Sequence, residues 1–293
     1  MSGNFTVIDF SERTRRREKF SGAVAVGNQV IFTPYNEHAV GIVNAVDDTF
    51  RLKDVSKQIS VRYKFVGAAH WDGKVIFPPF DARFVGIFDV ETTTFDMLQV
   101  SGTVSGPSKF AGAAAWDGQV IFAPYNWDGV GIYEVASNSF STVSIKDQIQ
   151  HDAKFFGAAV YDGVVVFAPE RADYVGVWDV SLSNFSMIDI STQVIGKDKF
   201  RGATEWEGKV IMAPRQSGCV GVFNVYTRTF LTIDVAPQLE IFDKIGHFSG
   251  AAALDGRIYL APDLSSSFGI LDMRVGALSD AEVYKGEKWG DEP

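Results

Sequence analysis

Six copies of a unit of about 45 residues predict an all-β fold, a six-bladed β-propeller with four antiparallel strands in each blade. A Lys-Phe-x-Gly phrase marks each copy, with histidine replacing lysine in the last, and its phenylalanines are Phe20, Phe65, Phe110, Phe155, Phe200 and Phe248. Two further markers recur with the same spacing. They are the prolines Pro34, Pro79, Pro124, Pro169, Pro214 and Pro262 and the glycines Gly41, Gly86, Gly131, Gly176, Gly221 and Gly269. No copy contains an amphipathic pattern of helical length, so each is read as strands and turns.

The third copy shows how four strands fit into one unit. We predict strands over 110–116 (FAGAAAW), 119–124 (QVIFAP), 130–135 (VGIYEV) and 140–145 (FSTVSI). Asp117-Gly118 is a strong signal for a two-residue hairpin, because glycine accepts positive φ. Pro124 ends the second strand, because proline cannot donate to a strand ladder.

The repeats predict a single domain over residues 1–293. Its copies lie near 19–63, 64–108, 109–153, 154–198, 199–246 and 247–273. The segment 4–10 (NFTVIDF) matches fourth strands such as 184–190 (NFSMIDI), so we expect it to complete the last blade and close the ring. A less apolar rival for that place is 278–283 (LSDAEV), and 284–293 is expected to be a surface tail.

The size of the side chains predicts which strand is innermost. The first strand of each copy is rich in glycine and alanine, as blades converging on an axis require. Larger residues, such as Phe122, Tyr133 and Phe140, stand on the later strands, and we read them as packing between blades rather than as cofactor contacts.

Composition limits the classes of partner. The formal net charge is -9, which disfavours nucleic acid. Cys219 is the single cysteine, and the first residues lack the pattern of a secretory signal, so a cytoplasmic protein is expected. No stretch approaches the length of an apolar membrane span.

The stretch 120–145 (VIFAPYNWDGVGIYEVASNSFSTVSI) resembles the repeat of the YVTN-type propeller superfamily. A β-rich run, a polar loop and an apolar strand are followed by a Thr/Asn-rich turn, and Asp89, Asp179 and the turn 91–94 (ETTT) fit this order. The repeats differ in having Ala-Pro where that superfamily has Thr-Asn, and six copies where seven are frequent. They differ from WD40 repeats because Trp71-Asp72 lies at the first hairpin, and they lack the Gly-Gly pair of kelch repeats. The resemblance implies a fold and a habit of binding, and no reaction.

In a propeller, the loops between strands two and three share a face with the connections between blades, and this loop-rich face is the predicted functional surface. One basic residue stands at the start of each first strand, and the six would surround the channel mouth: Lys19, Lys64, Lys109, Lys154, Lys199 and His247. Such a ring could hold an anion. Alternatively, each lysine pairs with a nearby acid such as Glu37, Asp81, Asp128 or Asp173 and locks adjacent loops.

The divergent loops supply the other candidate ligand-binding residues, which are Tyr35, Asn36, His38, Arg83, Tyr125, Asn126, Trp127, Arg171 and Arg215. A regular framework with divergent loops and no catalytic motif favours a non-enzymatic binding or scaffold protein. We expect it to take a protein partner or a small anionic ligand on this face, with no cofactor.

Two alternatives stay open, and any catalytic residues are unknown. A metal-dependent hydrolase or lactonase could recruit Asn36, Asn126 and Asp128 at the channel mouth, although a ring of lysines would oppose a divalent cation. The chain could also be a structural subunit of a larger complex.

Overall fold

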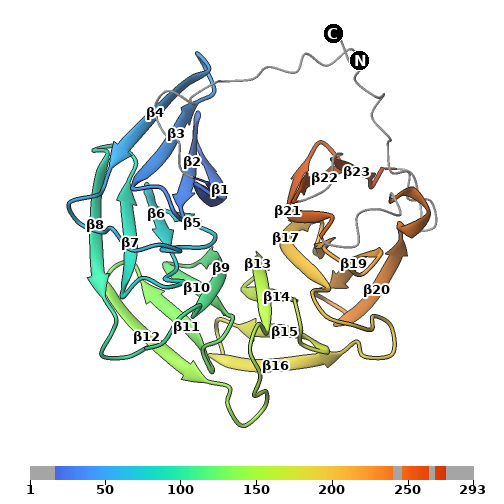
Figure 1. The fold of residues 1–293 in the computed structure, drawn as a ribbon. Coiled ribbons are helices and arrows are strands. Elements are labelled where there is room, and N and C mark those ends of the chain that lie inside the picture. Colours follow the sequence, from blue (N-terminus) through green and yellow to red (C-terminus); the bar gives the residue numbers. More distant parts are fainter. Residues whose placement is uncertain (1–16, 240–245, 264–267, 275–293) are drawn as a thin grey trace. The chain divides into compact units, whose positions relative to one another are not determined.

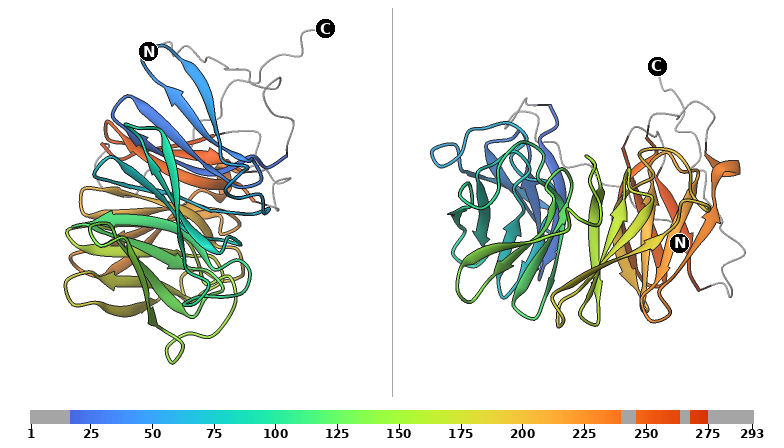
Figure 2. Two further views of the ribbon diagram at one scale, coloured as in Figure 1. Left: turned by 90° about the vertical axis from the view of Figure 1, so that its left-hand side faces the viewer. Right: turned by 90° about the horizontal axis from the view of Figure 1, so that it is seen from below.

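The computed structural model describes residues 17–239, 246–263 and 268–274 (Figure 1). Within these ranges the chain forms six antiparallel sheets, one for each repeat, and in each sheet the strands lie side by side in chain order. The predicted six-bladed β-propeller is thereby confirmed. The strands are twisted along each sheet, as L-amino acids require (Figure 2).

The chain divides into two compact units, which are described separately. Unit 1 comprises residues 1–122 and 129–144, and unit 2 comprises 123–128 and 145–293. The prediction of one domain over 1–293 stays a prediction.

Unit 1 contains the first two sheets and most of the third. The first sheet is β1 (Phe20–Val26), β2 (Gln29–Pro34), β3 (Ala39–Asn44) and β4 (Thr49–Asp54). The second is β5 (Ala69–Trp71), β6 (Lys74–Phe77), β7 (Phe84–Asp89) and β8 (Thr94–Gln99). The third is β9 (Phe110–Trp116), β10 (Gln119–Pro124), β11 (Gly129–Glu134) and β12 (Ser139–Ser144), within one residue of the predicted limits.

Unit 2 contains the remaining three sheets. The fourth is β13 (Phe155–Tyr161), β14 (Val164–Pro169), β15 (Tyr174–Asp179) and β16 (Asn184–Asp189). The fifth is β17 (Phe200–Trp206), β18 (Lys209–Pro214), β19 (Cys219–Asn224) and β20 (Thr229–Asp234), followed by the 3-10 turn η1 (Ala236–Gln238). The sixth has three described strands, β21 (Phe248–Leu254), β22 (Arg257–Pro262) and β23 (Gly269–Asp272). The expected closing strand 4–10, its rival 278–283 and the tail 284–293 lie outside the described residues.

Local chemistry explains the turns and the strand ends. Asp117 and Gly118 both have positive φ, 47° and 77°, as a tight hairpin turn of this kind requires. The periodic proline ends the second strand in five of the six sheets. In the second repeat, strand β6 stops earlier, at Phe77, because Pro78 and Pro79 both lack the N–H that a ladder needs.

The glycine of the Lys-Phe-x-Gly phrase lets neighbouring first strands approach closely. Gly67 has a φ of 79°, and a Cβ built on it would lie 2.6 Å from the Cα of Gly112 in the next repeat. The same contact recurs in unit 2, where a Cβ on Gly157 would lie 2.7 Å from the Cα of Gly202. Only glycine fits there, which explains the small residues that the sequence places on the first strand.

The second periodic glycine has a different role. In the third sheet the rings of Phe110 and Phe122 cover Gly131, which lies on strand β11. The centroids of these two rings are 5.6 Å apart. Phe140 lies on the neighbouring strand β12. A Cβ on Gly131 would lie 3.0 Å from both Phe110 and Phe122. The repeat therefore uses glycine on the third strand to seat aromatic rings from strands one, two and four.

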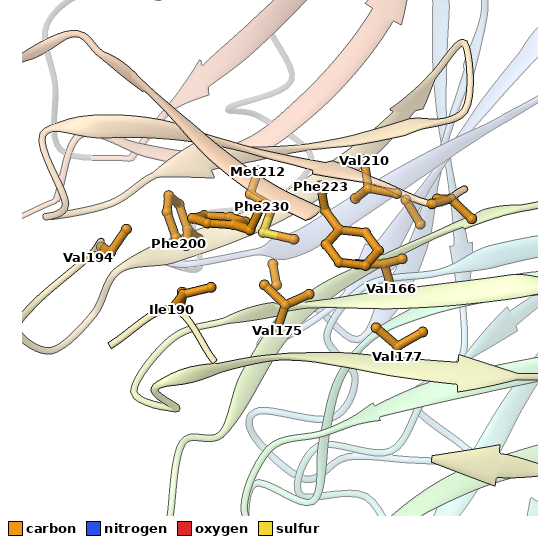
Figure 3. Close-up of a cluster of buried hydrophobic side chains, with 13 residues drawn as sticks. Val166, Val175, Val177, Ile190, Val194, Phe200, Val210, Met212, Phe223 and Phe230 are labelled. Carbon is orange, nitrogen blue, oxygen red and sulfur yellow. The ribbon is translucent and has the colours of Figure 1, made fainter. Parts of the chain in front are cut away.

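Apolar side chains fill the space between neighbouring sheets. In unit 2, Val166, Val175 and Val177 of the fourth sheet pack against Met212 and Phe223 of the fifth (Figure 3). Phe200 and Phe230, whose rings are 6.0 Å apart, lie in the same cluster. The aromatic residues of this sheet thus pack between blades, as expected.

Candidate functional site

The start of each first strand is hydrogen-bonded to the loop that joins strands two and three. In unit 1 the amide of Tyr35 donates to the carbonyl of Lys19 at 2.9 Å, and the amide of Lys64 donates to the carbonyl of Tyr35 at 3.1 Å. In unit 2 the amide of Lys154 donates to the carbonyl of Tyr125 at 3.0 Å. The loop at Tyr35 therefore joins Lys19 of its own repeat to Lys64 of the next, and the loop at Tyr125 is joined to Lys154 of the next repeat.

The ammonium groups of Lys154 and Lys199 are buried and tie adjacent loops together. The Nζ of Lys154 lies 2.9 Å from Asp128 and donates to the carbonyls of Asn126 and Trp127, both at 3.3 Å. The Nζ of Lys199 lies 3.0 Å from Asp173 and donates to the carbonyls of Arg171 and Ala172 at 3.2 and 3.1 Å. These are the contacts of the loop-locking alternative.

The other members of the predicted ring are also engaged. Lys64 is buried and its Nζ donates to the carbonyl of Tyr35 at 3.3 Å, while the Nζ of Lys109 donates to that of Gly106 at 2.9 Å. Burial lowers the pKa of Lys109, although the charge of Asp81 acts in the opposite direction. His247 is buried and its amide donates to the carbonyl of Arg215 at 2.7 Å; Lys19 is half-buried. Anion binding by these six residues stays a prediction.

The residues considered for a metal also connect loops. The Oδ1 of Asn36 accepts from the amide of Tyr63 at 3.1 Å, and its Nδ2 donates to Glu18 at 3.2 Å. The Oδ1 of Asn126 accepts from the amide of Ala153 at 2.9 Å. Throughout the described ranges, no group of three or more His, Cys, Asp and Glu side chains is arranged to hold a metal. The hydrolase alternative stays a prediction.

The remaining predicted residues lie on the loops as expected. The Tyr35 ring lies 5.0 Å from that of Tyr63 and 6.1 Å from that of Phe80. The amide of His38 donates to the Glu37 carboxylate at 2.8 Å. Trp127 is half-buried, and Arg83 is exposed on the loop between β6 and β7.

A charged cluster in unit 2 combines Arg215, a predicted ligand-binding residue, with residues that were not proposed for the site from the sequence. Glu170, which follows β14, is 1% exposed. Its Oε1 accepts from the Nη1 of Arg215 and from the Nη2 of Arg201, each at 2.6 Å. Arg215 follows β18, whereas Arg201 lies on β17, and both guanidinium side chains are 18% exposed. One carboxylate oxygen thus holds two arginines from the adjacent sheet.

Further charges surround this core at longer distances. The Oδ2 of Asp263 lies 3.7 Å from the Nε of Arg215 and 3.9 Å from the Nη1 of Arg201. The Oδ1 of Asp198 lies 3.9 Å from the Nη1 of Arg215 and 3.4 Å from the Nε of Arg171, whose side chain is 46% exposed. We call Glu170, Arg201, Arg215 and Asp263 the arginine cluster.

Two aromatic rings border the arginine cluster. The guanidinium carbon of Arg201 lies 4.3 Å from the ring centroid of Phe156, a cation–π distance. The Tyr125 ring meets that of Phe156 edge-on, with centroids 6.0 Å apart. Burial and the charge of Glu170 raise the pKa of Tyr125 to about 12, although the three nearby arginines act against this rise. The phenol is therefore protonated at neutral pH.

The arginine cluster leaves hydrogen-bonding capacity unused. Within the described ranges, the buried Oε2 of Glu170 and the Nε atoms of Arg201 and Arg215 have no hydrogen-bond partner. Buried polar atoms are normally paired, so such a group of exceptions calls for an explanation. Glu170, Arg201, Arg215 and Asp263 together carry no net charge, so the site can accept an anion through guanidinium N–H donors and not through an excess of positive charge.

A signal for the arginine cluster is present in the sequence. The residue after the periodic proline is aromatic in the first three copies, at Tyr35, Phe80 and Tyr125. In the last three it is charged with alternating sign, at Glu170, Arg215 and Asp263. Aligning the copies at this position would have indicated that successive members pair.

The comparisons show the fold alone. No known protein family and no curated protein sequence matches the chain. Among solved structures, virginiamycin B lyase from Staphylococcus aureus is 12% identical with a TM-score of 0.71, and the match covers 92% of this chain and 85% of that one. Streptogramin B lyase is 12% identical with a TM-score of 0.70, over 86% and 79%. The WD40 repeats of RRP9 are 12% identical with a TM-score of 0.68, over 88% and 78%. These likenesses confirm the predicted β-propeller fold.

The compartment is a separate question. Within the described ranges, no helix has the length and hydropathy needed to cross a membrane. A further similar structure, at 10% identity and a TM-score of 0.62, is the extracellular domain of BT4673 from B. thetaiotaomicron, so this fold also occurs outside cells. The cytoplasmic location stays a prediction.

Proposed function

We propose that the chain is a non-enzymatic binding protein that takes a small ligand bearing a carboxylate or phosphate at the arginine cluster. The observation that carries this proposal is the sharing of the Glu170 Oε1 by Arg201 and Arg215, each at 2.6 Å. Because both guanidinium groups donate to the same oxygen, each has further N–H donors that, among the described residues, make only the longer contacts to Asp263 and Asp198. A carboxylate or phosphate is the acceptor that a guanidinium fork fits best.

The surroundings of the two arginines support the same ligand class. Their side chains are 18% exposed, so an incoming anion would be largely withdrawn from water, where its attraction to the guanidinium groups is stronger. Phe156 and Tyr125 provide an apolar edge next to these charges. A ligand with an aromatic or aliphatic body and an acidic end would use both features.

The buried lysines have a supporting role in this proposal. The Nζ of Lys199 donates to the carbonyls of Arg171 and Ala172, and the backbone carbonyl of Lys154 accepts from the amide of Glu170, so both residues hold the loop that carries Glu170. A preformed loop framework lowers the cost of ordering side chains when a ligand binds. The locked loops therefore act as a rigid base for the arginine cluster. We propose separately that the protein works in the cytoplasm.

A protein partner on the same face is the second candidate. It is favoured by the divergence of the loops from one repeat to the next, and by the likeness to the WD40 repeats of RRP9. A protein carboxylate would be recognised by the same arginines, so the two candidates share one test of the site.

The test is a titration of the full chain with inorganic phosphate and, separately, with benzoate, followed by calorimetry and melting temperature. We expect at least one probe to bind, and its affinity to fall at least tenfold in Arg201→Gln. Arg201→Lys should fall as well, because lysine lacks the planar fork. Arg51→Gln, which removes an exposed arginine from β4 in unit 1, is the matched control. Equal affinity in Arg201→Gln and Arg51→Gln, or no binding of either probe at millimolar concentration, overturns the proposal.

A further inference from the structure

A second, unassigned group of side chains in unit 2 lies at turns of the fourth and fifth sheets. Tyr161 ends β13, and Tyr226 lies in the turn between β19 and β20. Their hydroxyl oxygens lie 2.6 Å apart, and their rings meet edge-on with centroids 5.5 Å apart. The pair therefore bridges two neighbouring sheets. We call it the tyrosine pair.

Packing fixes the Tyr226 ring but does not cover it. The ring lies over the hairpin of the fifth sheet, where a Cβ built on Gly208 would lie 2.6 Å from its Cε2. Even so, Tyr226 is 66% exposed, more than a ring with a purely structural role needs. A rigid and exposed aromatic ring is a favourable contact for a partner, because little conformational entropy is lost on binding.

Acidic side chains surround the tyrosine pair. Asp162 and Glu207 are exposed on the two adjacent hairpin turns. Asp162 and Glu205 lie near enough to Tyr226 for their charges to raise the pKa of its phenol, to which the hydrogen bond with Tyr161 contributes most. Glu205 also accepts from the amide of Gly208 at 3.0 Å.

The two nearby cations do not neutralise these acids. Lys209 lies over the Trp206 ring, 5.1 Å from its centroid. Arg228 points toward the fourth sheet, where its Nη1 donates to Ser186 at 3.4 Å and its charge lowers the pKa of Asp179. The carboxylates of Asp162, Glu205 and Glu207 thus outnumber these two cations, which contact Trp206 and Ser186. Lys209 also shows that an aromatic ring of this hairpin can hold a cation.

The acid at position 207 has no conformational explanation. The equivalent turn residues Asp117, Asp162 and Asp255 have φ values of 47°, 47° and 50°, which aspartate tolerates well. Glu207 adopts a φ of 46° without that preference. The conformation of the turn therefore does not explain the choice of glutamate at this position.

We propose that the tyrosine pair, with Asp162 and Glu207, is a docking surface for an arginine-bearing segment of a partner protein. A guanidinium group stacks on an exposed aromatic ring and pairs with carboxylates at its edge, so one arginine would use both parts of the surface. This surface is separate from the arginine cluster, and its occupant has the opposite charge, so the two proposals stand or fall independently.

The probe is a synthetic peptide with three arginines separated by Gly-Ser spacers, titrated into the full chain at low salt and followed by calorimetry. The same peptide with glutamate in place of arginine is the control ligand. We expect the arginine peptide alone to bind, with affinity falling at least tenfold in Tyr226→Ala and at least threefold in Glu207→Gln. Tyr226→Phe, which keeps the ring, should stay within threefold of the wild type.

Two matched variants separate this surface from general attraction to an acidic protein. Ile195→Ala removes an exposed apolar side chain from a connection between sheets of the same unit, and Glu91→Gln removes an exposed acid from a turn in unit 1. Both should bind the peptide as the wild type does. Equal losses in Glu91→Gln and Glu207→Gln, unchanged binding in Tyr226→Ala, or no binding at millimolar peptide would overturn the proposal. So would a dimer in sedimentation that Tyr226→Ala converts to a monomer, since the face would then join two copies.

Discussion

Arg215 donates a hydrogen bond of 2.6 Å to Glu170, and the two residues stand 45 positions apart, at the same place in successive repeats. In unit 1 the equivalent positions Tyr35 and Phe80 also meet, as a pair of aromatic rings 6.1 Å apart. The fold thus brings equivalent residues of adjacent blades into contact. At this aligned position, the first two repeats contact each other through the aromatic pair Tyr35 and Phe80, and the fourth and fifth through the ionic pair Glu170 and Arg215.

Loss of the Glu170 carboxylate should destabilise the fold strongly. In Glu170→Ala, two partly buried guanidinium groups would face each other without their shared acceptor, and we expect unfolding to become easier by about 3 to 5 kcal/mol. Urea unfolding followed by circular dichroism measures this change. Arg171→Ala is the matched control, because its ion pair with Asp198 is half exposed and should contribute less than about 1 kcal/mol. Similar midpoints for the two variants would mean that the arginine cluster does not stabilise the fold.

Periodic markers were sufficient to predict the sheets, whereas the arginine cluster was predicted only in part. Each repeat is a local unit, so Asp117-Gly118 and Pro124 determine the limits of nearby strands. The partners of Glu170 come from the next repeat, on two different strands, and that contact depends on how sheets pack. Burial of the lysines also escaped prediction, because the loops that cover Lys154 are polar in sequence and bind it through backbone carbonyls.

Gly67 should tolerate no side chain. Gly67→Ala would place a Cβ 2.6 Å from the backbone of Gly112, so at least one first strand must move, and we expect a loss of more than about 4 kcal/mol or no folded protein. Gly73→Ala is the matched control, because Gly73 has nearly the same φ, 73° against 79°, but nothing within 4 Å of its Cβ. Its cost should be only that of the left-handed backbone, about 1 to 2 kcal/mol. Equal expression and melting temperature of the two variants would refute the close approach.

Gly131 should be sensitive for a different reason. A methyl group there would lie 3.0 Å from the rings of Phe110 and Phe122, and overpacking of this kind costs about 1 to 3 kcal/mol. Gly102→Ala, at a position with open space around the Cβ, should change the free energy of unfolding by less than about 0.5 kcal/mol. Differential scanning calorimetry compares the two variants directly. A double variant, Gly131→Ala with Phe122→Leu, should lose less than the sum of the two single losses, since the smaller side chain removes one of the contacts that the methyl group meets.

Ionisation of Tyr125 should reduce stability at high pH. Its pKa in the folded chain is about 12, above the ordinary value of 10.0, chiefly because the phenol is buried and secondly because Glu170 is negative. The folded state therefore holds the proton after the unfolded state has released it. The stability that this phenol contributes is complete below about pH 10 and is lost as the pH rises through about 12. Tyr125→Phe lacks the group, so its free energy of unfolding should fall less than that of the wild type between pH 9 and pH 11.5. Urea titrations at several pH values measure the difference, in which the ionisation of other tyrosines and lysines cancels.

In the folded Glu170→Gln variant, absorbance at 295 nm should show one phenol ionising at lower pH than in the wild type, because the carboxylate charge has been removed. Parallel pH profiles for the wild type and Tyr125→Phe would show that Tyr125 is not held next to Glu170 in a water-poor environment, and would also weaken the case for a ligand site bordered by both residues.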